Sequence, residues 1–152
     1  MFGAYDDAPG APGWVAQVKN LHHAFVHRAN AGPISTFWCG CGAIRRSTFE
    51  ARGGFDAVRY PRGAIEDIEL GYRIHAAGGR ALLAPGTRAN HGEAWPLESV
   101  VRSDLFDRGI PWMWLLLRRE GARAELNLGL RARLCAAAVS LATAALMLTP
   151  IE

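Results

Sequence analysis

The sequence predicts an α/β fold in which helices are combined with a small sheet, and which forms part of a larger domain. Helical periodicity alternates with short apolar stretches bounded by Gly and Pro, a pattern typical of α/β or α+β architectures. Only about three strands are expected, too few for a free-standing doubly wound sheet. The third observation is the run of 18 uncharged residues at 134–151, close to the lower limit for a helix that crosses a bilayer.

The composition indicates a folded chain with an uneven charge distribution. Its 152 residues fit one domain of ordinary size, and 50% are hydrophobic, so a core can form. The arginines gather in the last third among Leu, Trp and Ala, which favours an anionic partner such as a phosphate group or a membrane surface. No nucleic-acid motif is present, so nucleic acid is not an expected partner. These arginines are Arg102, Arg108, Arg118, Arg119, Arg123, Arg131 and Arg133.

The three cysteines predict no metal or redox motif. Cys39 and Cys41 have neither zinc-knuckle nor thioredoxin spacing, and Cys135 lies in an apolar run. We expect all three to be small buried residues in a reducing compartment.

The first half of the chain predicts two helices. A helix is expected at 14–28, because apolar residues recur there at spacings of three and four: Val15, Val18, Leu21, Phe25 and Val26. Residues 35–44 are apolar, aromatic and interrupted by Gly, which indicates a strand or an extended loop. A short helix is expected at 45–51, closed by Gly53-Gly54, and a loop at 55–63.

The next segment predicts an acidic helix followed by two short strands. The helix is expected at 65–77, with carboxylates in its first turn, where they complement the helix dipole, and with Gly78-Gly79 at its end. Strands are expected at 80–84 and 87–91, separated by a turn at Pro85-Gly86.

The last third predicts helices that are amphipathic or wholly apolar. An amphipathic helix is expected at 96–107, with the following residues facing inward: Leu97, Val100, Val101, Leu105 and Phe106. Residues 110–117 fit either an interfacial membrane segment or a core helix. The run at 134–151 is rich in Ala and reads as either a membrane span or a buried helix. Arg131 and Arg133 before it indicate a cytoplasmic flank.

Five short segments, taken in their order and spacing, resemble the bacterial family 2 glycosyltransferases of the GT-A type. The resemblance covers about residues 1–119, and no single segment carries it alone. The five segments are Phe2–Asp7, the Gly-rich stretch Phe37–Arg46, the Gly53-Gly54-Phe55-Asp56 turn, the acidic helix Ile65–Arg73 followed by Gly78, and Asn90-His91.

The resemblance implies a partial GT-A fold, Rossmann-like, that lacks its N-terminal donor-binding half. Residues 1–95 would form the C-terminal part of that domain, 96–133 amphipathic helices at a membrane interface, and 134–152 the start of a transmembrane helix. The Asp-x-Asp that binds the metal in this family occurs nowhere in the sequence. The resemblance therefore implies that this motif lies upstream of Met1 and that the chain is a fragment.

The resemblance also implies a set of site residues. The Asp of the Glu66-Asp67 pair would be the general base, taking the proton from an acceptor hydroxyl as it attacks the anomeric carbon. Glu66 would face elsewhere and orient the acceptor. Donor and acceptor binding would involve Trp38, Gly40, Gly42, Arg45 and Arg108. His91 would help bind the divalent metal, Mg or Mn, or the diphosphate that the metal and positive charge stabilise.

Each of these roles has a structural alternative. Acidic residues such as Glu66 and Asp67 are common in the first turn of a helix, where they only cap it and complement its dipole. A lone His91 is often structural, and Arg102 or Arg108 would equally fit a basic membrane face. His22, His23 and His27 are expected on a solvated or packed helix face rather than around a metal.

The function implied is transfer of a sugar from a nucleotide-sugar donor to a lipid or glycan acceptor, with inversion, at the cytoplasmic face of the inner membrane. The processive Gln-x-x-Arg-Trp motif is absent from the sequence, which argues against a polymerase. The alternative is a non-catalytic module that associates with a membrane or binds a partner.

Overall fold

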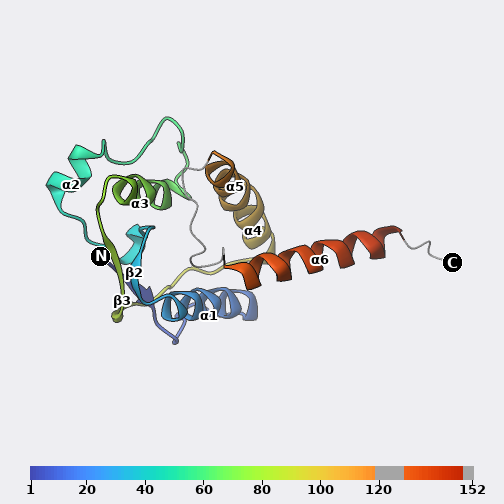
Figure 1. Cartoon of the computed structure of the whole chain (residues 1–152). Coiled ribbons are helices and arrows are strands. Elements are labelled where there is room, and N and C mark those ends of the chain that lie inside the picture. The colour runs from blue at the N-terminus through green and yellow to red at the C-terminus, as the bar shows by residue number, and fades with distance from the viewer. Residues whose placement is uncertain (119–128, 149–152) are drawn as a thin grey trace. The chain divides into compact units, whose positions relative to one another are not determined.

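The protein combines helices with a three-stranded sheet, the mixed class that the sequence predicts (Figure 1). The computed structural model describes residues 1–118 and 129–148. The chain forms two compact units, Met1–Ala122 and Arg123–Glu152. Each unit is described by itself.

The sheet has the order β1-β3-β2, with β3 (Ala81–Ala89) between β1 (Phe2–Tyr5) and β2 (Gly32–Ile34). β1 runs parallel to β3, and β2 runs antiparallel to it. Tyr5 pairs with Ala89 at the carboxyl ends of the two parallel strands. The segments that leave β1 and β3 therefore begin side by side.

The predicted turn at Pro85-Gly86 is wrong, because a single strand replaces the two that were expected. Between Phe2 and Ala4 on β1, the partners on β3 jump from Leu83 to Arg88. The extra residues of β3 include Pro85, which has no N–H to donate, and Gly86, which has no side chain to pack. Both are typical of a bulge. The sequence thus indicates the position of the interruption but not its form.

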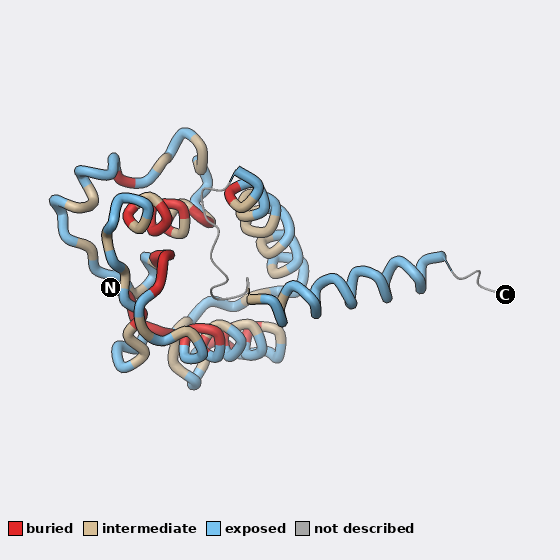
Figure 2. The backbone as a smooth tube through the Cα atoms, viewed as in Figure 1, coloured by how far each residue is buried: buried red, intermediate tan, exposed pale blue. Residues whose placement is uncertain are grey.

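The first helix, α1 (Trp14–Ala29), confirms the predicted helix, but much of its apolar stripe faces solvent. Trp14, Val18, Leu21 and Phe25 are 43% to 71% exposed. The buried face carries smaller or polar residues: Ala16, Asn20, Ala24, Val26 and His27. Figure 2 shows that buried residues otherwise concentrate in β1, in the start of the loop after β2 and in α3.

The segment after β2 is an extended loop rather than a strand. Residues 35–37 are buried, and a short 3₁₀ turn, η1 (Cys39–Cys41), follows. Gly42 then forms a bridge to Phe2. Next comes α2 (Arg46–Ala51), which ends at Gly53 and Gly54 with φ of 74° and 65°, as the sequence predicts.

Helix α3 (Glu66–Ala76) begins and ends as predicted, with Gly78 at φ 79° after its last turn. Its Glu69 and Arg73 side chains pair at 2.6 Å. The Arg73 guanidinium also donates to the carbonyls of Arg52 and Gly54. The acidic helix therefore holds the Gly53-Gly54 turn in place through Arg73.

The helix predicted at 96–107 continues further than expected, as α4 (Leu97–Arg102), the π-helical η2 (Ser103–Gly109) and α5 (Ile110–Leu117). Its predicted inward face is wrong at four of five residues: Val100 is half-buried, but Leu97, Val101, Leu105 and Phe106 are 47% to 62% exposed.

The side of this helical segment that faces the protein carries other residues. Leu115 is fully buried with Ile65 and Tyr72, and Trp112 Nε1 donates to the Tyr72 hydroxyl at 3.2 Å. The segment packs on the core through Trp112 and Leu115. The regularly spaced apolar residues of 97–106 therefore lie on its solvent-facing side.

The second unit contains α6 (Leu130–Leu148), 19 residues long with a mean hydropathy of 1.4. It is the one described helix that is long and apolar enough to cross a membrane, judged by length and composition. Residues 149–151 of the predicted run lie outside the described residues.

The prediction that the cysteines are buried is wrong. Cys39 and Cys135 are exposed, Cys41 is half-buried, and all three are free thiols. Cys39 is carried outward by the short turn that η1 makes.

Candidate functional site

The candidate site lies where the carboxyl ends of β1 and β3 meet, the edge at which open parallel sheets commonly bind ligands. Asp6 follows β1 and donates its N–H to the Ala89 carbonyl at 3.1 Å. Asn90 follows β3, and its amide donates to the Asp6 carboxylate at 3.2 Å. These contacts fix the two strand ends together and bring Tyr5 beside His91.

Tyr5 is the centre of an aromatic cluster at this edge. Its ring centroid lies 4.4 Å from that of Trp38 and 4.6 Å from that of His91, both edge-on. From α1, His27 stacks on Tyr5 at 5.6 Å and His23 meets it edge-on at 5.6 Å. His23 and His27 therefore occupy a packed helix face. Tyr5 was not among the predicted site residues, and the available signal was its position at the end of a strand beside the Asp6-Asp7 loop.

Burial shapes the ionisation of this cluster. It raises the pKa of Tyr5 to about 12, against a smaller opposing effect of the Arg108 charge. It lowers the pKa of His23 to about 2 and that of His27 to about 4. The phenol and the two imidazoles are therefore neutral near pH 7.

Asp67 is buried in the first turn of α3 and is only 6% exposed. Its Oδ2 accepts the N–H of Cys39 at 2.9 Å, and its Oδ1 accepts the N–H of Ile68 at 2.8 Å. Burial raises the pKa of this carboxyl and outweighs these two hydrogen bonds, while the nearby Glu66 charge acts in the same direction as burial. Although Cys39 as a whole residue is exposed, partial burial of its thiol and the Asp67 carboxylate raise the pKa of that thiol to about 12.

The contact between Asp67 and Cys39 depends on Gly71, one helical turn further along the same face of α3. A Cβ on Gly71 would lie 2.3 Å from the Phe37 nitrogen and 2.5 Å from the Thr36 carbonyl carbon. The backbone of the Gly-rich segment therefore lies directly on α3. This close approach carries the Cys39 N–H to the Asp67 carboxylate.

Gly40 and Gly42 make room for Trp38. A Cβ on Gly40 would lie 2.5 Å from the Trp38 indole, and one on Gly42 would lie 2.5 Å from the Trp38 carbonyl oxygen. Gly40 thus lets the turn fold against the Trp38 side chain, and Gly42 lets the chain pass the Trp38 carbonyl and the Phe37 ring.

Arg108 projects its charge into the same cluster from η2. Its guanidinium lowers the pKa of Tyr5, His23 and His91, although burial is the largest influence on each of them. Lys19 on α1 binds the Asp104 carboxylate at 2.5 Å and so fastens η2 beside α1. π-Helical turns are frequent at functional sites, and this one places Arg108.

The His91 ring is largely buried and incompletely hydrogen-bonded. Its Nδ1 is buried without a hydrogen-bond partner among the described residues, and its Nε2 lies 3.7 Å from Glu93. Burial lowers the pKa of His91, which favours the neutral imidazole that binds metals. However, residues 1–118 and 129–148 include no group of three His, Cys, Asp or Glu side chains that could hold an ion. On their own, the described residues do not form a metal site.

Two predicted residues stand apart from the cluster. The Glu66 carboxylate turns back to accept the N–H of Ala64, so it closes its own turn. Arg45 is exposed just before α2, and no contact given by the described residues connects it to Asp67. Of the predicted site residues, Trp38 and His91 therefore contact Tyr5 directly, and Asp67 and Arg108 act on its phenol through their charges, whereas Glu66 and Arg45 have neither link to it.

No family model matches this chain, and neither a curated protein nor a solved structure does.

Proposed function

We propose that this chain carries the acceptor-side part of a family 2 glycosyltransferase of the GT-A type, with Asp67 as its general base. The observation that carries the proposal is the Asp67 carboxylate itself, buried at the start of α3 and oriented by two backbone N–H groups. It lies in the segment order that resembles this family, next to an aromatic cluster at the end of two parallel strands.

The chemistry suits a carboxylate in this setting. A raised pKa makes the ionised form a stronger base, and the two N–H groups leave a second lone pair on each oxygen. Asp67 would accept the acceptor's O–H proton while the oxygen bonds to the anomeric carbon. The bond from that carbon to the nucleoside diphosphate breaks, and the diphosphate leaves with the electron pair and the configuration inverts.

The neighbouring side chains have matching roles. The half-buried Trp38 would offer a flat apolar surface against which a sugar ring can pack, with a polar N–H at its edge. The Arg108 guanidinium would attract the negative diphosphate, since arginine recognises phosphate oxygens well. The expected Mg or Mn would be held mainly by an Asp-x-Asp in the donor-binding part.

The proposal assigns the activity to a protein in which this chain works with a donor-binding part, because the sequence has no Asp-x-Asp. The acceptor would be a lipid or a glycan reached at the cytoplasmic face of the inner membrane, where nucleotide sugars are available.

The test begins with the natural gene product. An antiserum raised against this chain would identify the product in source cells, and its transcript would be sequenced. We expect an associated or in-frame βαβ region with an Asp-x-Asp, and release of nucleoside diphosphate from a panel of nucleotide sugars with membrane extract as acceptor. The proposal would be refuted by a gene product of 16.5 kDa that has no associated donor-binding part and that releases no nucleoside diphosphate from any nucleotide sugar.

A non-catalytic module that binds a membrane or a partner is the second candidate. It is favoured by the exposed apolar side chains on α1 and on α4 to α5. On that account the carboxylate of Asp67 only caps α3, and its replacement leaves binding unchanged.

A further inference from the structure

A continuous apolar stripe runs along the outer side of α4, η2 and α5. It consists of Leu97, Val101, Leu105, Phe106, Met113 and Trp114, which are 47% to 62% exposed. The spacing of four between the first three residues keeps them on one side of the helix. Soluble surfaces seldom expose so long an apolar row, so the stripe indicates a surface that is covered in use.

The opposite side of the same helical segment is already occupied by the protein. Asp104 binds Lys19 of α1, and Leu115 is fully buried against Ile65. Because these contacts fix how the segment is rotated about its own axis, the stripe cannot turn inward without breaking them. It is therefore a permanent outer face.

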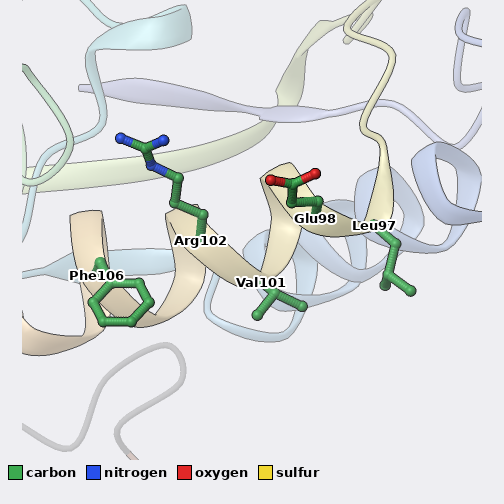
Figure 3. Close-up of a pocket in the computed structure, with 5 residues that line it drawn as sticks. All are labelled: Leu97, Glu98, Val101, Arg102 and Phe106. Atoms are coloured by element: carbon green, nitrogen blue, oxygen red, sulfur yellow. The ribbon is translucent and has the colours of Figure 1, made fainter.

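Charged groups border the stripe in the arrangement of an interfacial helix. Figure 3 shows Leu97, Val101 and Phe106 directed to one side of the helical segment, and Glu98 and Arg102 directed to the other. At the far end, the exposed Arg118 lies over the Trp114 ring at 5.9 Å. Helices that lie in a membrane interface combine an apolar face with arginines at its border and Trp at the boundary.

The chain that follows supports a bilayer as the occupant. Leu130, where α6 begins, is 12 residues after Arg118 in the sequence, and even a fully extended chain of that length spans only about 40 Å. The start of α6 carries Arg131 and Arg133, and its remaining residues have no charge. If α6 enters a bilayer, the Arg118 end of the helical segment stays within that distance of the start of α6.

We propose that the stripe docks on the surface of an anionic lipid bilayer, with α4 to α5 lying in the interface plane and the arginines on the lipid headgroups. This inference stands independently of the proposed function. Where that function also holds, Arg108 and the Tyr5 cluster sit on the segment's other side, which favours an acceptor that is presented by the lipid surface.

The test uses the full chain with a single environment-sensitive fluorophore. Cys39, Cys41 and Cys135 are replaced by Ser, and the fluorophore is attached through Leu105→Cys in the stripe. A second labelled chain carries Val58→Cys, a matched control because Val58 is 94% exposed and lies outside the stripe. A third carries Leu141→Cys in α6. Each is mixed with phosphatidylcholine vesicles, with or without phosphatidylglycerol, that contain brominated lipid as quencher.

We expect the Leu105→Cys label to shift to shorter wavelength and to be quenched, several-fold more with phosphatidylglycerol than without it. The Val58→Cys label should stay in water. Replacing Arg102 and Arg118 by Gln should remove the preference for anionic vesicles.

Two results would overturn the proposal. One is a Leu105→Cys label that stays in water while the Leu141→Cys label is quenched, which would mean that α6 binds alone. The other is a Leu105→Cys label that is already shielded from water without lipid and becomes exposed to water when the protein is diluted. That result would assign the stripe to contact with a second copy of the chain.

Discussion

The backbone N–H of Cys39 donates a 2.9 Å hydrogen bond to Oδ2 of Asp67. This bond joins the Gly-rich segment to the first turn of α3, two parts of the chain that are 28 residues apart. It orients a buried carboxylate next to Trp38 and, through it, next to the Tyr5 cluster. The first two predictions concern this junction.

Gly71→Ala should separate the two segments. The added Cβ meets backbone atoms of Thr36 and Phe37 at 2.3 to 2.7 Å, and backbone cannot move aside as a flexible side chain can. We expect the free energy of unfolding to fall by about 1 to 3 kcal/mol in urea, despite the better helix propensity of Ala. The control Gly86→Ala adds a Cβ in open space and should change it by less than about 0.5 kcal/mol. Equal stability of both variants would show that α3 does not lie on this backbone.

Asp67→Asn should change the pH dependence of stability. The folded-state pKa of Asp67 is raised, so its contribution to stability is present below the unfolded-state value near 3.8 and is lost as the pH rises through the folded value. The unfolding free energy of the wild type, relative to that of the variant, should therefore increase as the pH falls from 7 to 4. Urea unfolding at several pH values measures this difference. A difference that does not vary with pH would mean that burial leaves the carboxyl unperturbed.

His27→Phe should make the protein more resistant to acid. Burial lowers the pKa of His27 to about 4, so its contribution is present above the unfolded-state value near 6.5 and is lost as the pH falls toward 4. The difference between the unfolded-state and folded-state pKa values corresponds to roughly 3 kcal/mol of stability. Phe retains the stacking on Tyr5 but has no group to protonate. His22→Phe, at an exposed position on the same helix, is the control. The account fails here if the two variants lose stability in acid to the same extent.

Arg73→Met should loosen the Gly53-Gly54 turn. It leaves the Glu69 carboxylate, 6% exposed, without its partner and removes the donors to the Arg52 and Gly54 carbonyls. Because Arg73 is itself one-third exposed, we expect a loss of about 2 kcal/mol rather than the full value for a buried pair. Protease cleavage between 52 and 55 should become faster. A second change, Glu69→Leu, should restore part of the stability, and a further loss would contradict the assigned pairing.

Local signals in the sequence identify much of the fold. Helices α1 and α3 and the Gly53-Gly54 stop follow from apolar spacing and from Gly. The strands agree with the expectation only in their total, because 35–44 is a loop and β3 replaces the two strands expected at 80–84 and 87–91. The contact of Asp67 with the Gly-rich segment, and its dependence on Gly71, are visible only in the structure, where the two backbones meet.

The orientation of the helices is less accessible from sequence. α1 has two possible inner faces, and the one that packs uses Ala16, Asn20 and Ala24 because small residues allow close approach to β1. The exposed apolar face then carries Val18 and Phe25. Apolar periodicity shows that a stripe exists but not whether the core or another surface covers it.

The role of Tyr5 was also hidden in the sequence. Its neighbours His91, Trp38 and His27 come from three distant segments: the pairing of β1 with β3 brings His91 to it, and the packing of α1 and of the loop after β2 brings the other two. The sequence shows only that Tyr5 precedes the Asp6-Asp7 loop, and not which side chains surround it.

The most direct test of the central claim is the sugar-transfer rate of Asp67→Asn in the complete gene product, beside the exposed control Glu50→Gln. We predict that Asp67→Asn lowers kcat by about 100-fold to 10,000-fold while the circular dichroism spectrum and the KM for the nucleotide sugar stay near those of the wild type. Glu50→Gln should transfer sugar normally. Full activity in a correctly folded Asp67→Asn protein would contradict the assignment of Asp67 as the base and favour the non-catalytic module.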